Sequence, residues 1–566
     1  MNKRDGFETL VDYLAAFGID IYTGVTGGGV VHYVKYLTPY EPNQIKPALF
    51  TISEYPAGFA PLGHYLATGK VGGAIATTGA ATKLLACGLS DAKLHDIPSV
   101  YIFPISTRRH QEDSALQDTS IYGSNIIKQL EAEIEDVFLL DNPYTFAKYL
   151  EQAGKALLSR KPVVFLLDNE IMNLPMSEEP KIIKNKLHDS SIEIAIFVQL
   201  LKKKVKDRRV LLLVGEEGLH ETDIRQLTTA VSIELAAATV WSMNGVNCVG
   251  SENPYGYGCI SFGGNDKALN LWESMTEDDV VICVGVTPDE YTTNLQKFAA
   301  GDVFFITQTA NAYGHIRGSF QHSALHKFHQ INAPITKVLK TIITEGKREV
   351  YSTTASPLAP VELNTCVLEP PRAHYADMKI VYQHLHKWWQ PGSLVISDVC
   401  LAYKDYQYVT QRPNDTITYF SFYRGSAMGG AYGVAVGAKL AQPDKRVYLF
   451  SGDGCFRLYG GSLNEAKNLG IVLFILDNHT YSIVAQGLPA ILPSVHPEKY
   501  HDTLQQVDYG KIAEASGWLS YTVAPDLSNF EDILNELERY KKQSILVTIP
   551  VDPNQILGQN PRVRNL

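Results

Sequence analysis

The chain has 566 residues, a formal net charge of −10 and a hydrophobic fraction of 45%. This length suffices for about three domains, and the acidic balance excludes the basic surface that is typical of nucleic-acid-binding proteins. The seven cysteines include no Cys-x-x-Cys pair, and neither a secretion signal nor a run of about 18 apolar residues is present. We therefore expect a cytoplasmic protein with reduced thiols, no nucleic-acid partner and no membrane span.

Alternating helix and strand patterns predict three domains. Residues 1–185 form the first, and the charged stretch 176–188 leads into the second, at 190–345. The proline-rich stretch 358–372 precedes the third domain, at 375–553. Because short apolar runs alternate with helical patterns, we expect α/β domains, each a doubly wound, mostly parallel sheet flanked by helices.

One acidic residue stands out in the first domain. Glu54 follows the strand-like run 49–53 and precedes the small-residue run 55–60, which favours a helix. Upstream, residues 24–29 form a glycine-rich turn. The helix dipole favours a carboxylate in the first turn of any helix. Position alone therefore does not assign Glu54 a role.

The third domain contains the most specific pattern of the chain. Gly452-Asp453-Gly454 follows the strand-like run 445–451, and Asn478 follows the next apolar run, 471–476. Because parallel strands end at the same edge of a sheet, both groups are expected to lie together at that edge. Mg²⁺ prefers carboxylate and amide oxygens, and glycines let a diphosphate approach the backbone. Residues 462–469, between the two strands, are expected to form a helix.

With this pattern the chain resembles the thiamine diphosphate-dependent enzymes that act on 2-oxo acids, whose signature is Gly-Asp-Gly followed by an Asn pair. Here the pair is Asp477-Asn478, a departure at its first position. The resemblance implies that Asp453, Asn478 and the backbone carbonyl of Thr480 ligate Mg²⁺. It also implies that Glu54 acts in catalysis by hydrogen-bonding the aminopyrimidine ring of thiamine diphosphate, the cofactor that supplies the chemistry.

The resemblance continues beyond these motifs. Residues 76–82 and 161–168 are similar to segments of the family's first domain. Residues 425–430 are similar to the segment that carries a large apolar residue between the two cofactor rings; here that residue is Met428, and the carbonyl of Ser426 would accept from the 4′-amino group. The cofactor-binding residues implied in this way are Glu54, Gly28, Thr78, Ser426, Met428, Gly452, Asp453, Gly454, Cys455 (through its backbone N–H), Asn478, Thr480 and Tyr481.

Residues around the expected cofactor distinguish the family's subgroups. Pyruvate decarboxylases have an acidic residue after the first glycine turn and a Glu beyond the metal motif, where this chain has Gly28 and Val484. Benzoylformate decarboxylases have a histidine where Thr77 stands. Gly28, Val484 and Met428 are instead similar to the acetohydroxyacid (acetolactate) synthases. The run 114–118 is also similar to that subgroup, and it implies that Gln117 faces the reacting carbon as a second catalytic residue.

Because no proton donor is expected beside the reacting carbon, we expect an acetolactate synthase-like carboligase. It would decarboxylate a 2-oxo acid, with pyruvate as the first choice, and transfer the acyl carbanion equivalent to a carbonyl acceptor. The alternatives are a decarboxylase that releases an aldehyde, acyl transfer to a specialised acceptor such as a ketosugar, and a non-catalytic binding homologue. In the family the active site lies between two chains, which implies a homodimer or a dimer of dimers.

Two segments depart from the synthase pattern. Arg108-Arg109-His110 lies where synthases carry apolar or small residues; it would bind a carboxylate or phosphate of an unusual acceptor, or form a solvated surface cluster. The segment 485–505 does not match the synthase cap over the site. Some synthases also carry FAD in the middle domain. Their flavin contacts are not matched here, because residues 285–289 and 308–311 are equally plain strand-end loops, so we favour the absence of FAD.

Overall fold

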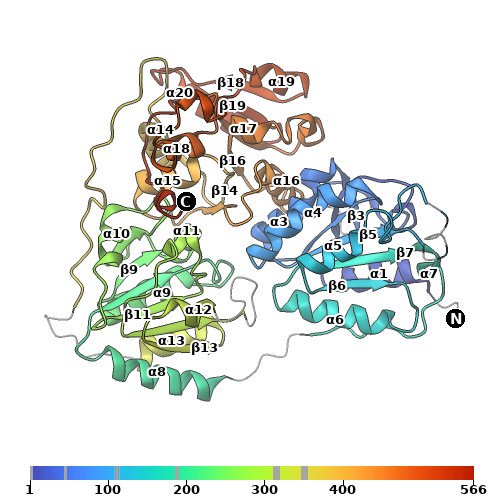
Figure 1. The fold of residues 1–566 in the computed structure, drawn as a ribbon, viewed down its shortest axis with the longest axis horizontal. Helices are drawn as coiled ribbons and strands as arrows, with labels where there is room; N and C mark the ends of the chain where they lie inside the picture. The colour runs from blue at the N-terminus through green and yellow to red at the C-terminus, as the bar shows by residue number, and fades with distance from the viewer. Residues whose placement is uncertain are drawn as a thin grey trace.

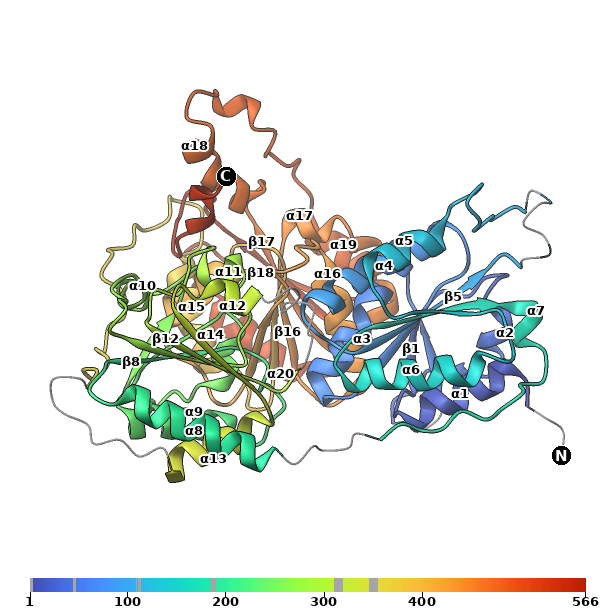
Figure 2. The ribbon, with the colours of Figure 1, turned by 60° about the horizontal axis from the view of Figure 1, so that its bottom comes forward.

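The computed structural model describes residues 4–43, 47–107, 109, 113, 115–184, 190–309, 319–345 and 355–566. In these ranges the chain forms three sheets in which all neighbouring strands run parallel, and helices pack on each sheet (Figures 1 and 2). The predicted class, an α/β protein with three parallel sheets, is confirmed. Within the described part of the chain, no helix combines the length and the apolar character that crossing a bilayer requires.

The first sheet has the strand order β2-β3-β1-β4-β5-β7-β6. Its strands are β1 (Ile21–Gly24), β2 (Thr38–Pro39), β3 (Ala48–Thr51), β4 (Gly72–Ile75), β5 (Ser99–Ile105), β6 (Val137–Leu140) and β7 (Val163–Asp168). Its helices are α1 (Gly6–Ala16), α2 (Val31–Val34), α3 (Glu54–Thr68), α4 (Ala80–Leu94), α5 (Ile126–Glu133), α6 (Phe146–Leu158) and α7 (Asn169–Met172). Strands β4, β5 and β7 are buried along their whole length, which explains why the sequence shows apolar runs there and no alternation.

The second sheet has the order β10-β9-β8-β11-β12-β13. Its strands are β8 (Val210–Val214), β9 (Ala238–Trp241), β10 (Gly256–Cys259), β11 (Val280–Val284), β12 (Asp302–Thr307) and β13 (Lys327–Asn332). Its helices are α8 (Ser191–Val205), α9 (Ile224–Leu235), α10 (Asp266–Glu273), α11 (Glu290–Thr293), α12 (Ser319–Ser323) and α13 (Ile335–Glu345). In this order, typical of dinucleotide-binding folds, the crevice for a ligand lies between β8 and β11.

The third sheet has the order β15-β14-β16-β17-β19-β18. Its strands are β14 (Leu394–Ser397), β15 (Thr418–Ser421), β16 (Val447–Gly452), β17 (Ile471–Asp477), β18 (Leu519–Thr522) and β19 (Ile545–Pro550). The helices are α14 (Met378–Trp388), α15 (Ala402–Thr410), α16 (Gly430–Ala441), α17 (Asp453–Phe456), α18 (Ser482–Ile491), α19 (Tyr509–Ala515) and α20 (Phe530–Arg539). Strands β16 and β17 are adjacent, so the two sequence motifs end at the same edge of the sheet.

Helices α3 and α16 join the first and third sheets (Figures 1 and 2). Glycines bring the two backbones into direct contact: a Cβ atom on Gly63 would lie 1.8 Å from the carbonyl oxygen of Val434, and one on Gly437 would lie 1.8 Å from that of Ala60. Helix α3 begins at Glu54, and α16 follows Met428 and Gly429. This helix pair therefore fixes two of the predicted cofactor segments relative to each other.

The prediction of a helix over residues 462–469 is wrong. Two short 3-10 turns, Gly460–Ser462 and Asn464–Ala466, stand in its place. Side chains from elsewhere donate to the carbonyl oxygens that a helix would use: Tyr432 to Ser462 (2.8 Å), Trp518 to Leu463 (2.6 Å) and Ser544 to Ala466 (2.7 Å). Tertiary hydrogen bonds thus replace the helical ladder.

Candidate active site

A cleft with a volume of about 210 Å³ opens at the carboxyl ends of β16 and β17. Nine of the predicted cofactor-binding residues line it: Ser426, Met428, Gly452, Asp453, Gly454, Cys455, Asn478, Thr480 and Tyr481. The fold therefore brings together residues that are 55 positions apart in the sequence.

Asp453 lies at the bottom of this cleft, 2% exposed. Its Oδ2 accepts hydrogen bonds from the backbone N–H of His479 (2.7 Å) and of Asn478 (3.3 Å), and its Oδ1 accepts from Gly454 N–H (2.9 Å). Burial raises the pKa of the Asp453 carboxyl, and these three donors oppose that rise. The left-handed conformation of His479 (φ 56°), rare for a residue with a side chain, turns its N–H toward the carboxylate. The loop is thus folded around Asp453.

A second carboxylate stands beside Asp453. Ligand atoms of Asp453, Asp477 and His479 all lie within 4.8 Å of one another, a spacing that a metal ion could bridge. The side-chain oxygen of Asn478 accepts from Thr480 N–H (3.1 Å), which orients the amide. Oxygen donors of Asp453 and Asn478 fit Mg²⁺. Asp477, where the family signature has an Asn, adds a carboxylate to this group.

Residues 424–429 include the lining residues Ser426 and Met428, and buried acids hold this segment. Asp398, which follows β14, accepts from Gly429 N–H (3.0 Å) and from the hydroxyl of Ser451 (2.9 Å). Complete burial raises the pKa of Asp398 to about 6. Asp91 of α4 accepts from Gly425 N–H (3.1 Å), and the hydroxyl of Tyr55, next to Glu54, donates to the carbonyl of Met428. The sequence did not identify these three supporting side chains, Asp398, Asp91 and Tyr55, as part of the site.

The structure places the predicted residues of the first domain apart from this cleft. Among the described residues that line the cleft, none belongs to residues 4–184. Glu54 is half-buried at the first position of α3, Thr78 is buried, and Gly28 is exposed. Gln117 is exposed in an open groove that residues 79–83 and 115–124 line, where a Cβ atom on Gly79 would lie 3.0 Å from its amide nitrogen.

Of the two segments that depart from the synthase pattern, the structure describes 485–505 in full and Arg108-Arg109-His110 only at Arg109. Arg108 and His110 lie outside the described residues, so the predicted cluster has no structural account. Residues 485–491 continue helix α18, and the chain then returns to the metal loop: Leu504 N–H donates to the carbonyl of His479 (2.7 Å), and Tyr481 N–H donates to Asp502 (2.8 Å). The segment 485–505 therefore folds back onto the loop that carries Asn478 and Thr480.

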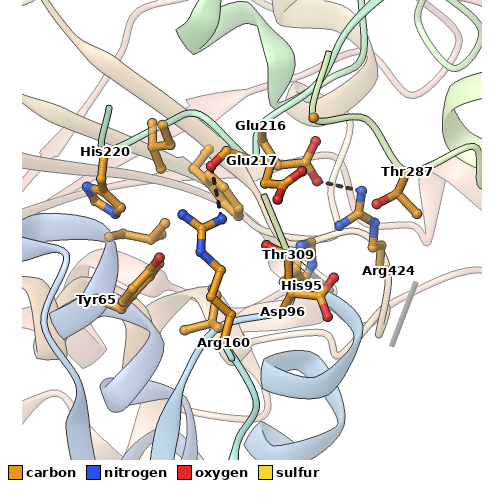
Figure 3. Close-up of a pocket in the computed structure, with 15 residues that line it drawn as sticks. Tyr65, His95, Asp96, Arg160, Glu216, Glu217, His220, Thr287, Thr309 and Arg424 are labelled. Atoms are coloured by element: carbon orange, nitrogen blue, oxygen red, sulfur yellow. Dashed lines mark hydrogen bonds and ion pairs between the residues drawn. The ribbon is translucent and has the colours of Figure 1, made fainter. Parts of the chain in front are cut away.

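The crevice of the second sheet is a small pocket of about 40 Å³, and side chains from all three domains line it (Figure 3). A Cβ atom on Gly215 would lie 2.2 Å from the carbonyl oxygen of Gly285, so the loops after β8 and β11 touch. The carboxylate of Glu217 accepts from the Thr307 hydroxyl (2.8 Å) and from Gln308 N–H (2.9 Å). These residues do not fit a dinucleotide, whose negatively charged pyrophosphate would meet this carboxylate.

Buried arginines cross-link that crevice to the other two sheets (Figure 3). Arg160, which precedes β7, donates to the carbonyl of Glu217 (2.9 Å). Arg424 pairs with Glu216 (2.5 Å) and with Asp289 (2.7 Å). Since Arg424 is only two residues from Ser426, the crevice supports the wall of the cleft.

Two domain families match the chain. The thiamine pyrophosphate enzyme N-terminal TPP binding domain matches residues 4–125, and the thiamine pyrophosphate enzyme C-terminal TPP binding domain matches residues 400–549. The chain therefore carries the N- and C-terminal TPP binding domains of the thiamine pyrophosphate enzymes, as its Gly-Asp-Gly motif predicts. Thiamine diphosphate is the cofactor that these two domains bind.

Individual relatives carry different activities. The chain is 23% identical to the acetolactate synthase large subunit of Haemophilus influenzae, over 98% of this chain and 96% of that protein. It is 30% identical to a 3D-(3,5/4)-trihydroxycyclohexane-1,2-dione hydrolase of Geobacillus thermodenitrificans, over 24% of this chain and 23% of that protein. The thiamine diphosphate-dependent 4-hydroxybenzoylformate decarboxylase of Rhodococcus jostii RHA1 shares the fold, with a TM-score of 0.78, 15% identity and coverage of 98% of this chain and 100% of that one. The reaction must therefore be argued from the site.

Proposed function

We propose that the protein is a Mg²⁺- and thiamine diphosphate-dependent carboligase, similar in its reaction to acetolactate synthase. Asp453, Asn478 and the carbonyl of Thr480 would hold the metal ion and through it the diphosphate, while Met428 and the carbonyl of Ser426 would hold the ring system. When bound, thiamine diphosphate supplies an electron sink for the acyl carbon. Glu54 would hydrogen-bond the aminopyrimidine.

In this reaction the bond between the acyl carbon and the carboxylate breaks, and CO₂ leaves. The electron pair remains with the acyl group and forms a bond to the carbonyl carbon of the acceptor, whose oxygen takes up a proton. Simple decarboxylation differs in one respect, since a proton and not an acceptor takes that electron pair. The proton donors beside the acyl group therefore decide between the two outcomes.

The observation that supports carboligation is the composition of the cleft wall. Among the described residues that line it, Asp453 is the sole carboxylic acid, and it is already assigned to the metal. Val484, 52% exposed, stands where pyruvate decarboxylases have a Glu. Without an acid at this place, the acyl group is not protonated early and persists until an acceptor arrives.

A decarboxylase is the second candidate, because one hydroxyl group does reach the cleft. Tyr291 lines it, and the Tyr291 hydroxyl lies 3.5 Å from the hydroxyl of Ser426. A phenol is a weaker acid than a carboxylic acid, so we rank this reaction second. The structural similarity to a decarboxylase is one of fold alone and does not change this order.

We also propose a homodimer, or a dimer of dimers, in which the first domain of one copy completes the cleft of the other. Two observations support it: Glu54 and Gln117 do not line the cleft of their own chain, and the groove around Gln117 exposes Leu116 (101%) and Tyr122 (85%). A large exposed apolar patch is typical of an interface. The seven cysteines, all unpaired, support a cytoplasmic location, and the Glu217 carboxylate in the crevice of the second sheet supports a protein without FAD.

The decisive experiment is to incubate the protein with thiamine diphosphate, Mg²⁺ and pyruvate, with and without aldehyde, 2-oxo acid and ketosugar acceptors, and to identify the products by mass spectrometry. An acceptor-dependent adduct that carries two carbons from pyruvate would establish the carboligase. Acetaldehyde as the sole product would favour the decarboxylase. Failure to consume any 2-oxo acid, although the cofactor raises the melting temperature, would reject both and favour a non-catalytic homologue.

A further inference from the structure

The C-terminal turn of the chain, Pro561–Arg564, is docked beside the cleft, near α11 and α18 (Figures 1 and 2). The carbonyl of Pro561 accepts from the side chain of Asn294 (3.3 Å), and the side chain of Asn565 donates to Glu290 (2.9 Å). On the other side Val563 packs so closely on Gly487 of α18 that a Cβ atom there would lie 2.9 Å away. The turn is thus fixed by both helices.

This docking brings Arg562 to the cleft. Its Nε pairs with the carboxylate of Glu290 (3.0 Å), and its Nη1 donates to the hydroxyl of Tyr291 (2.7 Å). The side chain is 29% exposed and lines the cleft with Met428 and Val484. Because Glu290 holds Nε and Tyr291 holds Nη1, the guanidinium is oriented before any ligand binds. Its second terminal nitrogen, Nη2, makes none of these contacts.

Arg562 is the sole cationic side chain among the described residues that line the cleft. A guanidinium presents a planar fork that matches carboxylate or phosphate oxygens, and such charge-assisted hydrogen bonds are roughly twice as strong as neutral ones. An anion therefore fits the Arg562 position. Under the proposed function, the anion belongs either to the donor 2-oxo acid or to the acceptor.

Charge in the transition state separates these two cases. Decarboxylation removes the donor's negative carboxylate, so a cation that bound this carboxylate would stabilise the substrate more than the transition state and would slow the reaction. An anionic group on the acceptor keeps its charge throughout, so a cation can bind it at every stage without this loss. The apolar part of the wall favours decarboxylation, because it destabilises the donor's charged carboxylate.

We propose that Arg562 binds an anionic group of the carbonyl acceptor, so that the natural acceptor carries a carboxylate or a phosphate. The inference rests on the proposed carboligase function and names the class of its second substrate. The competing explanation is purely structural: Arg562 would do no more than hold the C-terminal turn to α11 through Glu290. The two explanations differ in which substrates a change at Arg562 affects.

The test compares Arg562→Gln with Arg564→Gln. Arg564 is exposed on the same turn and does not line the cleft, so the control removes the same charge outside the site. Pyruvate is the donor, and acceptors are used in matched pairs with and without an anion: glyoxylate against acetaldehyde, and glyceraldehyde 3-phosphate against glyceraldehyde. We expect Arg562→Gln to raise KM for the anionic member of the preferred pair about 10- to 100-fold and to affect the neutral member less than about threefold.

Two further measurements distinguish a role of Arg562 in acceptor binding from a purely structural role. The rise in melting temperature caused by thiamine diphosphate with Mg²⁺ should be equal in both variants, because Arg562 does not contact the metal residues. Arg562→Lys should retain part of the preference for anionic acceptors, since it keeps the charge and loses the planar fork. If the Gln variant does not fold, the Lys variant against Arg564→Lys decides the question.

A binding measurement makes the test independent of turnover. The cofactor-loaded protein is titrated calorimetrically with lactate and with glycerol 3-phosphate, which carry the two anions without a reactive carbonyl. Binding to wild type and to Arg564→Gln, weakened at least tenfold in Arg562→Gln, supports the inference and shows which anion is preferred. No binding of either anion to wild type up to about 10 mM, or equal losses for charged and neutral acceptors, overturns it. Failure of wild type to consume any 2-oxo acid would instead reject the proposed function.

Discussion

The substitution Gly437→Ala tests the contact between α3 and α16. The added Cβ atom would lie 1.8 Å from the carbonyl oxygen of Ala60 and 2.5 Å from its carbonyl carbon, against at least 3.4 Å for an ordinary contact. The obstacle is backbone of a buried helix, so no side-chain rotation relieves it. The two helices would have to separate by about 1.5 Å, and a shift of that size would disturb the link between Tyr55 and Met428.

Two opposing effects determine how much Gly437→Ala lowers the free energy of unfolding. Overpacking a core costs about 1–3 kcal/mol and occasionally more, and a clash with backbone belongs at the upper end of that range. Alanine gains about 1 kcal/mol over glycine in a helix interior. The clash therefore dominates, with a net loss of about 2 kcal/mol, which for a domain of roughly this size lowers Tm by about 4–8 °C. Differential scanning calorimetry of the variant, with and without thiamine diphosphate and Mg²⁺, measures both the loss and its effect on the cofactor.

Gly461→Ala is the matched control. Gly461 is exposed, and no atom lies within 4 Å of its added Cβ, so this variant should melt within about 1 °C of wild type, as surface substitutions usually do. A Gly437→Ala protein that melts like the control, and that the cofactor stabilises as much as wild type, would refute the helix contact described here.

Three further substitutions address the site. Glu54→Gln should retain the Tm rise caused by thiamine diphosphate and lose turnover at least about 100-fold; near-normal turnover would remove Glu54 from catalysis. Asp453→Ala should lose that Tm rise, because the variant lacks the metal ligand and leaves two or three backbone N–H groups unpaired; wild-type cofactor affinity by calorimetry would contradict the metal assignment. Burial raises the pKa of Asp91 from 3.8 to about 7, so wild type has a stabilising contribution below about pH 4 that is lost as the pH rises to about 7, roughly 4 kcal/mol at most. Asp91→Asn cannot ionise and should melt above wild type at pH 8, with the difference vanishing near pH 4; a difference that grows toward low pH would show that the carboxylate is favoured in the native state.

The sequence predicts the strands well where they are buried on both faces. Residues 471–476 are predicted as a strand and form β17, Ile471–Asp477, because a strand covered on both sides is a continuous apolar run. The same argument predicts that Asp453 and Asn478 meet, since both follow adjacent parallel strands. The error over 462–469 has the opposite cause. Local pattern favours a helix there, and donors from Tyr432, Trp518 and Ser544 override it.

The residues that the sequence missed support the cleft from distant parts of the chain. Asp398 follows the apolar run 394–397, so a systematic search of strand ends would have found it. Tyr291 and Arg562 have no such signal: their hydrogen bond joins residues 271 positions apart, and no periodic pattern or motif encodes it. The tail after β19 acquires its position from contacts with α11 and α18.

The distribution of charge in the cleft connects the metal site, the proposed reaction and the proposed acceptor. Among its described lining residues two are charged, Asp453 and Arg562, and the wall otherwise includes apolar side chains such as Leu401, Met428 and Val484. An apolar wall disfavours a carboxylate and so favours its loss as CO₂. Two groups stay charged through the proposed reaction, the metal ion and the acceptor's anion, and the cleft provides an opposite charge for each, from Asp453 and from Arg562. This match between persistent charge and protein charge is why we propose an anionic acceptor and not a neutral aldehyde.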